Sequence, residues 1–327
     1  MLRAWLEFAA CLAVIGYAGF KLTRYADAIA EKARLSASWS GLALLATVTS
    51  LPELMTGASA VTVAAAPNIA VGDVLGSSVF NLVLLASVDL ARRGPSLYAR
   101  ASRGHIVSAA FSIALLGIVL LGLALGGAGP ALGRVGWYSP VIFAAYALAI
   151  HAVLRYERGL TPAVLHMAPR HPRLTLRQAA LRYALFGAVV VAAGAWLPFV
   201  GVRLAQAMGW SNTFVGTLFV ALVTSVPEIV TTLAAVRIGA LDMAIGGILG
   251  SNLFDVVIFA IDDVLYAPGP ILADVSPAHA ISAASAMVMS ACVVAALWVR
   301  PQRARWMSAA MVALFLLNSW AVYRAAA

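Results

Sequence analysis

The sequence predicts an all-α polytopic membrane protein with about ten transmembrane helices, arranged as two inverted five-helix repeats. The first observation behind this prediction is composition: of 327 residues, 63% are hydrophobic and only 11% are charged, whereas a soluble domain contains about 25% charged residues. The second is length, because many apolar stretches reach the roughly 20 residues that a helix needs to cross a bilayer. The third is a polar motif that occurs once in each half of the chain.

The predicted spans are the apolar stretches between charged, glycine-rich or proline-containing segments. The first repeat covers residues 1–156, a short basic cytoplasmic loop covers 157–176, and the second repeat covers 177–327. The ten spans lie at approximately 5–20, 37–64, 68–90, 105–126, 137–155, 177–198, 211–236, 240–266, 277–299 and 304–323.

Basic residues concentrate in loops that fall on one side of the membrane when ten spans are counted. The positive-inside rule places this side in the cytoplasm and both termini outside, where the basic residues would face anionic lipid headgroups on the cytoplasmic side. The net charge of +9 is therefore assigned to membrane loops and not to a nucleic-acid surface. The basic loops are 21–36, 91–104, 155–177 and 299–305.

The opposite side carries few basic residues. It receives an alanine-proline turn near 64–67 and the acids Asp262, Asp263 and Asp274. Because these acids follow or end a span, we expect them to form a solvated outer rim. Short loops with many alanines and arginines favour a prokaryotic inner membrane, and the sequence predicts no particular oligomeric state.

The polar motif links the two halves of the chain. Residues 48–54 read Val-Thr-Ser-Leu-Pro-Glu-Leu, and residues 223–229 read Val-Thr-Ser-Val-Pro-Glu-Ile. The copies lie on the second and seventh spans, an odd number apart, so they are inverted with respect to the membrane. Their offset of 175 residues becomes 174 where Asn68 aligns with Asp242. Inverted repeats with interrupted helices are typical of secondary transporters.

Each motif places oxygen atoms on one helical face. Thr49 and Ser50 precede Glu53 by four and three residues, which brings them to the same side of a helix as Glu53. Pro52 removes a backbone hydrogen bond, so the helix should break and free carbonyl oxygens near Ala46 and Thr49. The second motif repeats this arrangement with Thr224, Ser225, Pro227, Glu228 and the carbonyl of Ala221.

A second polar segment follows each motif. Ser77 and Asn81 are four residues apart, as are Ser251 and Asp255. The two segments complete a predicted ring of carboxylate, hydroxyl, amide and carbonyl oxygens, which are the ligands that hard cations such as Ca²⁺ and Na⁺ take. An acid in the hydrocarbon is costly and marks a functional site, although the serines have the alternative of bonding their own helix carbonyls.

Other metal chemistry is not predicted. Softer metals prefer histidine or cysteine ligands, and neither motif contains one. The five histidines lie near span ends or in loops, while Cys11 and Cys292 lie in apolar spans, where packing is expected. No cofactor is expected.

Together the motifs resemble the α-repeats of the cation/Ca²⁺ exchanger superfamily, which includes the Na⁺/Ca²⁺ exchangers. The resemblance covers about 41–85 and 216–262 closely, and the ten-span plan extends it across the chain. It implies that Glu53 and Glu228 coordinate Ca²⁺ and that spans one and six slide as a gate. It further implies a central-site pair in Asn81 and Asp255, Na⁺-site hydroxyls in Ser77 and Ser251, side-chain or backbone ligands in Thr49, Ser50, Thr224 and Ser225, and carbonyl ligands in Ala46 and Ala221.

Some positions depart from the family pattern. Val48 and Val223 stand where the family has glycine, and Ser78, Asp73 and Gly247 stand where it has asparagine. None of these changes removes an oxygen ligand carried over from the family, but Asp73 adds an acid close to the site. The departures bear on ion selectivity.

The expected function is secondary active antiport that exchanges Ca²⁺ for Na⁺ by alternating access. The nearest alternative uses H⁺ as the counter-ion, and a less favoured one is a passive cation channel, since channels more often form symmetric oligomeric pores. An intramembrane enzyme is disfavoured, because the sequence has no nucleotide or zinc motif and no soluble catalytic domain.

Overall fold

The computed structural model describes residues 1–32, 46–126, 129–158, 174–299 and 301–325. Nearly all of this chain is helical, and the two short strands form a hairpin. The elements of the first half are α1 (Leu2–Lys32), α3 (Ala46–Thr49), α4 (Leu51–Thr62), α5 (Pro67–Ala91), η2 (Leu97–Arg100), α6 (His105–Leu125), β1 (Ala131–Leu132), β2 (Val135–Gly136) and α7 (Tyr138–Arg158). Those of the second half are α8 (Leu176–Met208), α9 (Asn212–Val215), η3 (Gly216–Val220), α10 (Ala221–Thr224), α11 (Val226–Arg237), α12 (Leu241–Leu265), η4 (Ile271–Ala273), α13 (His279–Trp298) and α14 (Pro301–Ala325).

The predicted all-α polytopic fold is confirmed. Among the described residues, eight helices are long and apolar enough to cross a membrane, and the bent pair Asn212–Thr224 and Val226–Arg237 makes a ninth span. The remaining predicted span, 37–64, starts outside the described residues, and α3 and α4 form its described part. The helices α5, α6, α12 and α13 end within two residues of their predicted bounds.

Two helices extend about ten residues beyond their predicted bounds. α1 continues through Lys32, so Lys21 and Arg24 lie on the helix and not in a loop. The Lys21 ammonium lies 5.4 Å from the centre of the Tyr17 ring, as expected where long basic side chains extend from a span toward the interface. α8 continues to Met208 through Pro198.

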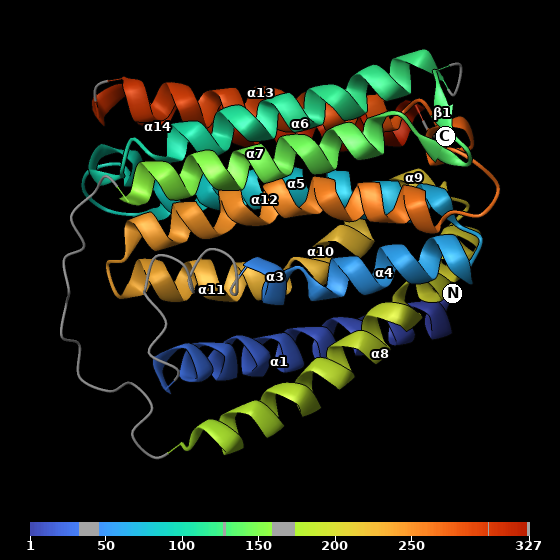
Figure 1. The fold of residues 1–327 in the computed structure, drawn as a ribbon, viewed down its shortest axis with the longest axis horizontal. Coiled ribbons are helices and arrows are strands. Elements are labelled where there is room, and N and C mark those ends of the chain that lie inside the picture. The colour runs from blue at the N-terminus through green and yellow to red at the C-terminus, as the bar shows by residue number, and fades with distance from the viewer. Residues whose placement is uncertain (33–45, 127–128, 159–173, 300, 326–327) are drawn as a thin grey trace.

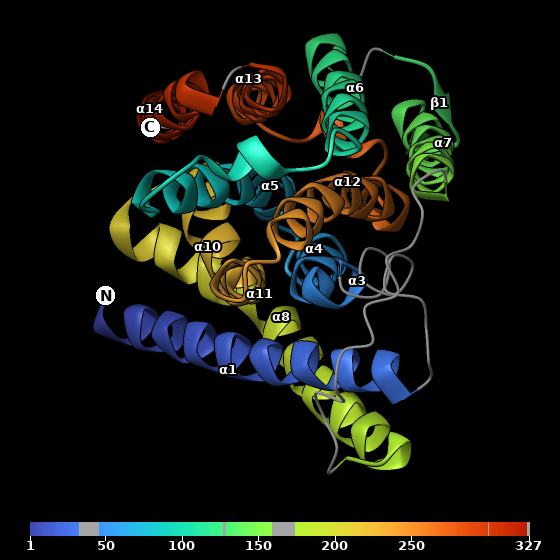
Figure 2. The same ribbon diagram turned by 90° about the vertical axis from the view of Figure 1, so that its left-hand side faces the viewer.

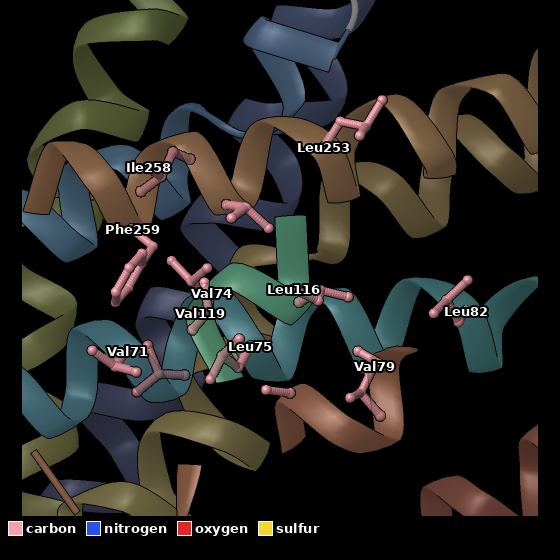
Figure 3. Close-up of a cluster of buried hydrophobic side chains, with 14 of the residues drawn as sticks. Val71, Val74, Leu75, Val79, Leu82, Leu116, Val119, Leu253, Ile258 and Phe259 are labelled. Atoms are coloured by element: carbon pink, nitrogen blue, oxygen red, sulfur yellow. The ribbon is translucent and has the colours of Figure 1, made fainter. Parts of the chain in front are cut away.

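The helices form three layers (Figure 2). α1 and α8 pack together on one side, α6, α7, α13 and α14 lie on the other, and the broken helices with α5 and α12 lie between them. In the most apolar stretch of α5 and of α12, 83% of residues are buried, against 22–44% in the six other unbroken spans. Aliphatic side chains of α5, including Val74 and Leu75, pack with α6 and α12 residues such as Val119 and Ile258 (Figure 3). α5 and α12 are therefore the central helices.

The helix ends and loops separate into two ends of the bundle (Figure 1). We call the end that carries both marked chain termini and the β1–β2 hairpin the termini end. The other end, with η2 and the turn between α11 and α12, is the basic end. α4 and α12 both run toward the termini end, whereas α5 and α11 run away from it.

The aligned residues Asn68 and Asp242 make corresponding contacts across the two halves. Asn68 Oδ1 accepts hydrogen bonds from the Ser276 backbone N–H at 2.7 Å and from His279 Nε2 at 3.1 Å. Asp242 Oδ1 accepts from the Ser102 N–H at 2.6 Å and lies 3.0 Å from His105 Nε2. Each side chain thus holds the start of a helix that belongs to the other half.

The expected acidic rim is largely wrong. Asp274 is exposed, but Asp262 and Asp263 are buried, with 1% and 0% of their surface exposed. Asp263 accepts from the Gly136 N–H, the Ser139 hydroxyl, the Tyr138 hydroxyl and the Ile271 N–H at 2.5–2.9 Å. Buried polar groups need such partners, and these donors come from the hairpin, α7 and η4, which a span count does not reveal.

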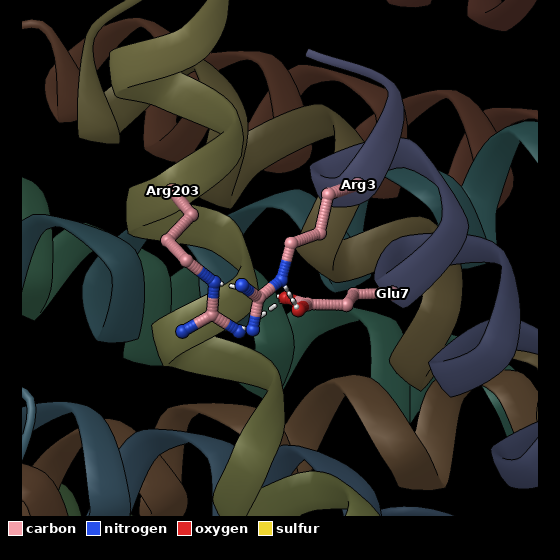
Figure 4. A network of polar contacts seen from close by, with 3 residues as sticks. All are labelled: Arg3, Glu7 and Arg203. Atoms are coloured by element: carbon pink, nitrogen blue, oxygen red, sulfur yellow. Dashed lines mark hydrogen bonds and ion pairs between the residues drawn. The ribbon is translucent and has the colours of Figure 1, made fainter.

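An ion pair joins the two helices of the outer layer (Figure 4). Glu7 on α1 accepts from Arg203 on α8 and from Arg3 one turn earlier on its own helix, at 2.5–2.9 Å. Both glycines Gly16 and Gly19 of α1 face the broken helix, where an added Cβ at position 19 would lie 2.7 Å from Pro227 Cγ. α1 therefore lies directly against the segment that carries the second motif.

Candidate cation-binding site

The two motifs break their helices at the same place. α3 ends at Thr49 and α4 starts at Leu51, while α10 ends at Thr224 and α11 starts at Val226. Ser50 and Ser225, at the breaks, have nearly the same backbone angles (φ −87°, ψ 13° and φ −78°, ψ 4°). In both copies the proline takes a position in the first helical turn, where its missing N–H is tolerated. The predicted interruptions are confirmed.

Hydroxyl pairs connect each broken helix to the central helix of the other half. Thr49 Oγ1 lies 3.4 Å from Ser251 Oγ, and Thr224 Oγ1 lies 3.4 Å from Ser77 Oγ. Ser225 also donates to Ser77 at 3.1 Å. The predicted polar residues of the two motifs and of the two downstream segments thus meet in the middle of the bundle.

Three predicted carboxyl groups lie in this cluster. Glu53, Glu228 and Asp255 are each 1–2% exposed. Glu228 Oε1 accepts from Ser251 at 3.3 Å and Asp255 Oδ1 from Ser50 at 3.5 Å. Glu53 lies within electrostatic range of both other carboxyl groups. Three acids of like charge are therefore held together in a buried site.

Asn81 makes a contact that the sequence analysis did not assign. Its amide nitrogen donates to Asn252 Oδ1 at 2.9 Å, and Asn252 donates in turn to the Ser78 carbonyl at 3.1 Å. This orientation leaves Asn81 Oδ1 buried, with no protein partner among the described residues. Asn252 thus orients the amide so that its oxygen remains available.

Asp73 is a fourth carboxyl group of the cluster. It is fully buried, its Oδ1 accepts from the Thr224 hydroxyl at 2.8 Å, and it interacts electrostatically with Glu228. Its position four residues before Ser77 on α5 places both on one helical face, and this spacing is the signal that assigns it to the site.

Each of the four carboxyl groups keeps an oxygen without a protein partner. Within the described part of the chain, these buried atoms are Oε2 of Glu53 and Glu228 and Oδ2 of Asp73 and Asp255. A buried acceptor without a donor is costly, and bound cations would satisfy such oxygens. No three acidic, histidine or cysteine side chains among the described residues are close enough to form a metal cluster, so hydroxyl and amide oxygens would have to share the ligation.

The structure bears differently on the two predicted carbonyl ligands, those of Ala221 and Ala46. The Ala221 carbonyl is not left free by the break, because it accepts from the Ser225 N–H at 3.0 Å and the Thr224 hydroxyl at 3.2 Å. The threonine side chain bonds back to its own helix and continues the hydrogen-bond pattern up to the break. Ala46 is the first described residue of α3, and its carbonyl remains a predicted ligand.

A small cavity opens beside the cluster. Its lining extends from Glu228 and Ser251 to Thr232 and Gly247, and because α11 runs toward the basic end and α12 starts there, the cavity lies on the basic-end side of the cluster. Gly247 contributes to its wall, and a Cβ at this position would meet no atom of the described chain within 4 Å. Its lining residues are Thr49, Glu228, Thr231, Thr232, Gly247, Ile248 and Ser251.

The chain has two Gly-x-x-x-Gly spacings, Gly72/Gly76 on α5 and Gly246/Gly250 on α12, and their glycines bring helices close. A Cβ at Gly76 would lie 2.8 Å from Ala221 Cβ, and one at Gly72 would lie 2.9 Å from the Thr217 backbone nitrogen. α5 therefore packs directly on the backbone of the segment before the second break. In the second spacing, Gly246 faces the His105 ring.

A bundle of membrane-spanning helices with two interrupted helices and acids buried at its middle is typical of membrane transporters. The sequence model of the family described as "Sodium/calcium exchanger protein" matches residues 3–154 and 179–324. The chain belongs to this family, as its two motifs indicated. Among curated proteins, the inner membrane protein YrbG of Escherichia coli K12 is 28% identical over 235 residues, which cover 71% of this chain and 70% of YrbG.

Two solved structures share the fold. The sodium-calcium exchanger NCX_Mj superposes with a TM-score of 0.62 at 21% identity, covering 97% of each chain. The H⁺/Ca²⁺ exchanger CAX superposes with a TM-score of 0.64 at 13% identity, covering 98% of this chain and 89% of that one. The same architecture thus occurs in exchangers that their names assign to different counter-ions.

Proposed function

We propose that this protein is a secondary antiporter that exchanges Ca²⁺ for Na⁺ through the buried cluster around Glu53 and Glu228. The observation that carries the proposal is the set of four carboxyl groups that each present a partnerless buried oxygen at the helix breaks. Carboxylate, amide and hydroxyl oxygens are the ligands that hard cations take. Family membership adds independent support.

The charges of the site suit either ion. When one or two of the four carboxyl groups carry protons, the remaining two or three balance one Ca²⁺ or several Na⁺. Protonation of some members is expected, because like charges this close in a buried site disfavour full ionisation. Ca²⁺ and Na⁺ would then compete for the same oxygens, which is the basis of exchange.

Alternating access follows from two inverted halves, residues 1–156 and 177–327, around one site. Mirrored contacts such as Asn68–His279 and Asp242–His105 support this division. α1 and α8 act in the proposal as the gate, because they form a separate outer layer joined by Glu7 and Arg203. Sliding of this pair across the broken helices would expose the site to one side of the membrane at a time.

The test is ⁴⁵Ca²⁺ uptake into proteoliposomes under an outward Na⁺ gradient. Glu53→Gln should abolish uptake, since it removes a charge at the centre of the site while keeping the side chain's shape. Asp274→Asn, an exposed acid at the termini end, serves as the matched control and should transport normally. Unchanged uptake by Glu53→Gln would contradict the site assignment.

H⁺ coupling is the second candidate, favoured by the structural likeness to CAX and by the fourth carboxyl group at Asp73. Uptake driven by a pH gradient without Na⁺ would identify a proton-coupled exchanger. Uptake that needs Na⁺ would identify Na⁺ coupling. Flux that depends on neither gradient would identify a passive channel.

The proposed location is a prokaryotic inner membrane with both termini outside. The positive-inside rule supports this orientation, since the described basic loop 91–104, which includes η2, lies at the end away from the termini. Cysteine-accessibility labelling from each side of the membrane, with single cysteines at each end of the bundle, tests it.

A further inference from the structure

Asp262 stands apart from every other acid at the termini end. It is 1% exposed, and neither of its carboxyl oxygens has a hydrogen-bond partner in the described chain. Its neighbour Asp263 has four donors within 2.9 Å. Asp263 therefore holds the structure together, whereas the Asp262 side chain makes no hydrogen bond within the described part of the chain. A buried acid that lacks any such partner is unexplained by stability.

The position of Asp262 relates it to the central site. It lies seven residues after Asp255 on α12, which is nearly two full turns and therefore the same helical face, displaced by roughly 10 Å. α12 runs toward the termini end, so the displacement is in that direction. The Asp262 carboxyl group thus lies between the central cluster and the termini end.

Gly57 makes room for this carboxyl group. A Cβ at Gly57 would lie 2.6 Å from Asp262 Oδ1 and 2.7 Å from its Cγ. Gly57 follows Glu53 by four residues on α4, so Glu53 and the carboxyl group beside Gly57 share one face of that helix. Asp73 of α5 lies within electrostatic range of Asp262. Three helices, α4, α5 and α12, therefore surround the group.

The alignment of the two halves shows which part of the second half corresponds to the surroundings of Asp262. The cavity that leads from Glu228 toward the basic end is lined by Thr232 and Gly247. With the offsets of 175 and 174 residues, their counterparts are Gly57 and Asp73. Asp262 therefore occupies the counterpart of that cavity on the termini side. Beside Glu228 this place is a small cavity. At the corresponding place beside Glu53 lie the two acids Asp73 and Asp262.

We propose that Asp262, seated against Gly57 and opposite Asp73, is an outer binding site for the transported cation on its passage between the central cluster and the termini end. This inference rests on the proposed transport function. The oxygens of a carboxyl group without protein partners suit a hard cation. An acid along a narrow passage also raises the local concentration of cations and speeds their arrival.

The experiment measures Ca²⁺ dependence from each side separately. Proteoliposomes with protein in one orientation receive ⁴⁵Ca²⁺ at the termini face or at the basic face, with an opposing gradient of the counter-ion. Asp262→Asn should raise the apparent KM at the termini face by about tenfold, with the KM at the basic face and the maximal rate unchanged. Asp274→Asn, an exposed acid at the same end, should leave both KM values unchanged.

A second variant moves the carboxyl group without removing its charge. Gly57→Ala should displace Asp262 and raise the same one-sided KM, and it should have no further effect in the Asp262→Asn background. Equal KM changes at both faces, no change at either, or a changed pH dependence with an unaltered Ca²⁺ KM would overturn the proposal. Failure of Asp262→Asn to yield a monodisperse membrane protein would also overturn it, because the residue would then serve the fold.

The experiments distinguish a failure of the proposed outer site from a failure of the proposed transport function. If Glu53→Gln transports normally, the central site is wrong whatever Asp262 does. If Glu53→Gln is inactive and Asp262→Asn behaves like the wild type from both faces, only the outer site is wrong.

Discussion

The hydroxyl groups of Thr49 and Ser251 lie 3.4 Å apart, the same distance that separates their counterparts Thr224 and Ser77. The surroundings of the two pairs differ. Ser251 donates to the Glu228 carboxyl group at 3.3 Å, whereas Ser77 receives a hydrogen bond from Ser225. The two pairs are therefore alike in geometry, but the serine contacts a carboxyl group in the first pair and the threonine does so in the second, where Thr224 donates to Asp73. The two serines should thus respond differently to equivalent substitutions.

Ser251→Ala should weaken Ca²⁺ binding more than Ser77→Ala. The first change removes a hydrogen bond to a carboxylate that the proposal assigns to Ca²⁺, an interaction worth about 1.5 kcal/mol or roughly tenfold in affinity. The second removes contacts between neutral hydroxyls. Equilibrium ⁴⁵Ca²⁺ binding to the purified protein measures both, and the reverse ranking would contradict the assignment of Ser251.

Asp263→Asn should destabilise the fold by at least about 2 kcal/mol, because an amide nitrogen would then face donors in a buried site. The loss appears as a lower midpoint of thermal unfolding in detergent. Asp262→Asn, one residue earlier, removes no hydrogen bond and should not lower the midpoint. A larger loss for Asp262→Asn than for Asp263→Asn would show that the two roles are reversed.

Gly76→Ala and Gly247→Ala form a matched pair on the two central helices. A methyl group at position 76 would lie 2.8 Å from Ala221 Cβ, so overpacking should cost about 1–3 kcal/mol and lower the yield of folded protein. A methyl group at position 247 meets open space in the described chain and should leave the unfolding midpoint unchanged. Size-exclusion profiles and unfolding midpoints of the two variants test this expected difference in stability.

Gly19→Ala should slow transport without weakening Ca²⁺ binding. The added Cβ would lie 2.7 Å from Pro227 Cγ, at the contact between α1 and the second broken helix. If α1 slides as part of the gate, this contact should hinder movement while leaving the ion ligands in place. Uptake rates and equilibrium ⁴⁵Ca²⁺ binding on the same preparation separate the two effects. Weaker binding with an unchanged rate would argue against a gate at this position.

The sequence predicts the spans well because hydropathy and length are local properties. It also places the breaks, because Pro52 and Pro227 act on their own helices. It misses the burial of Asp263, whose donors Gly136 and Tyr138 lie more than a hundred residues away. From the sequence alone, an acid near a span end is predicted to be solvated, because its distant donors are not visible.

Within the site, the prediction is strongest where a residue repeats and weakest where the halves differ. Glu53 and Glu228 repeat, and the structure brings both to the cluster. Asp73 has Gly247 as its counterpart and Asp262 has Val88, so repetition alone could not mark them. The Ala221 carbonyl was expected to be free, but the adjacent Thr224 hydroxyl bonds to it.

The mirrored contacts of Asn68 and Asp242 have a consequence for biogenesis. Asn68 is synthesised some two hundred residues before its partners Ser276 and His279. During translation the Asn68 amide therefore lacks these two partners until Ser276 and His279 have been synthesised. The first half should insert early but acquire its final packing only when the second half arrives, so the nascent chain depends on the order in which its helices are delivered.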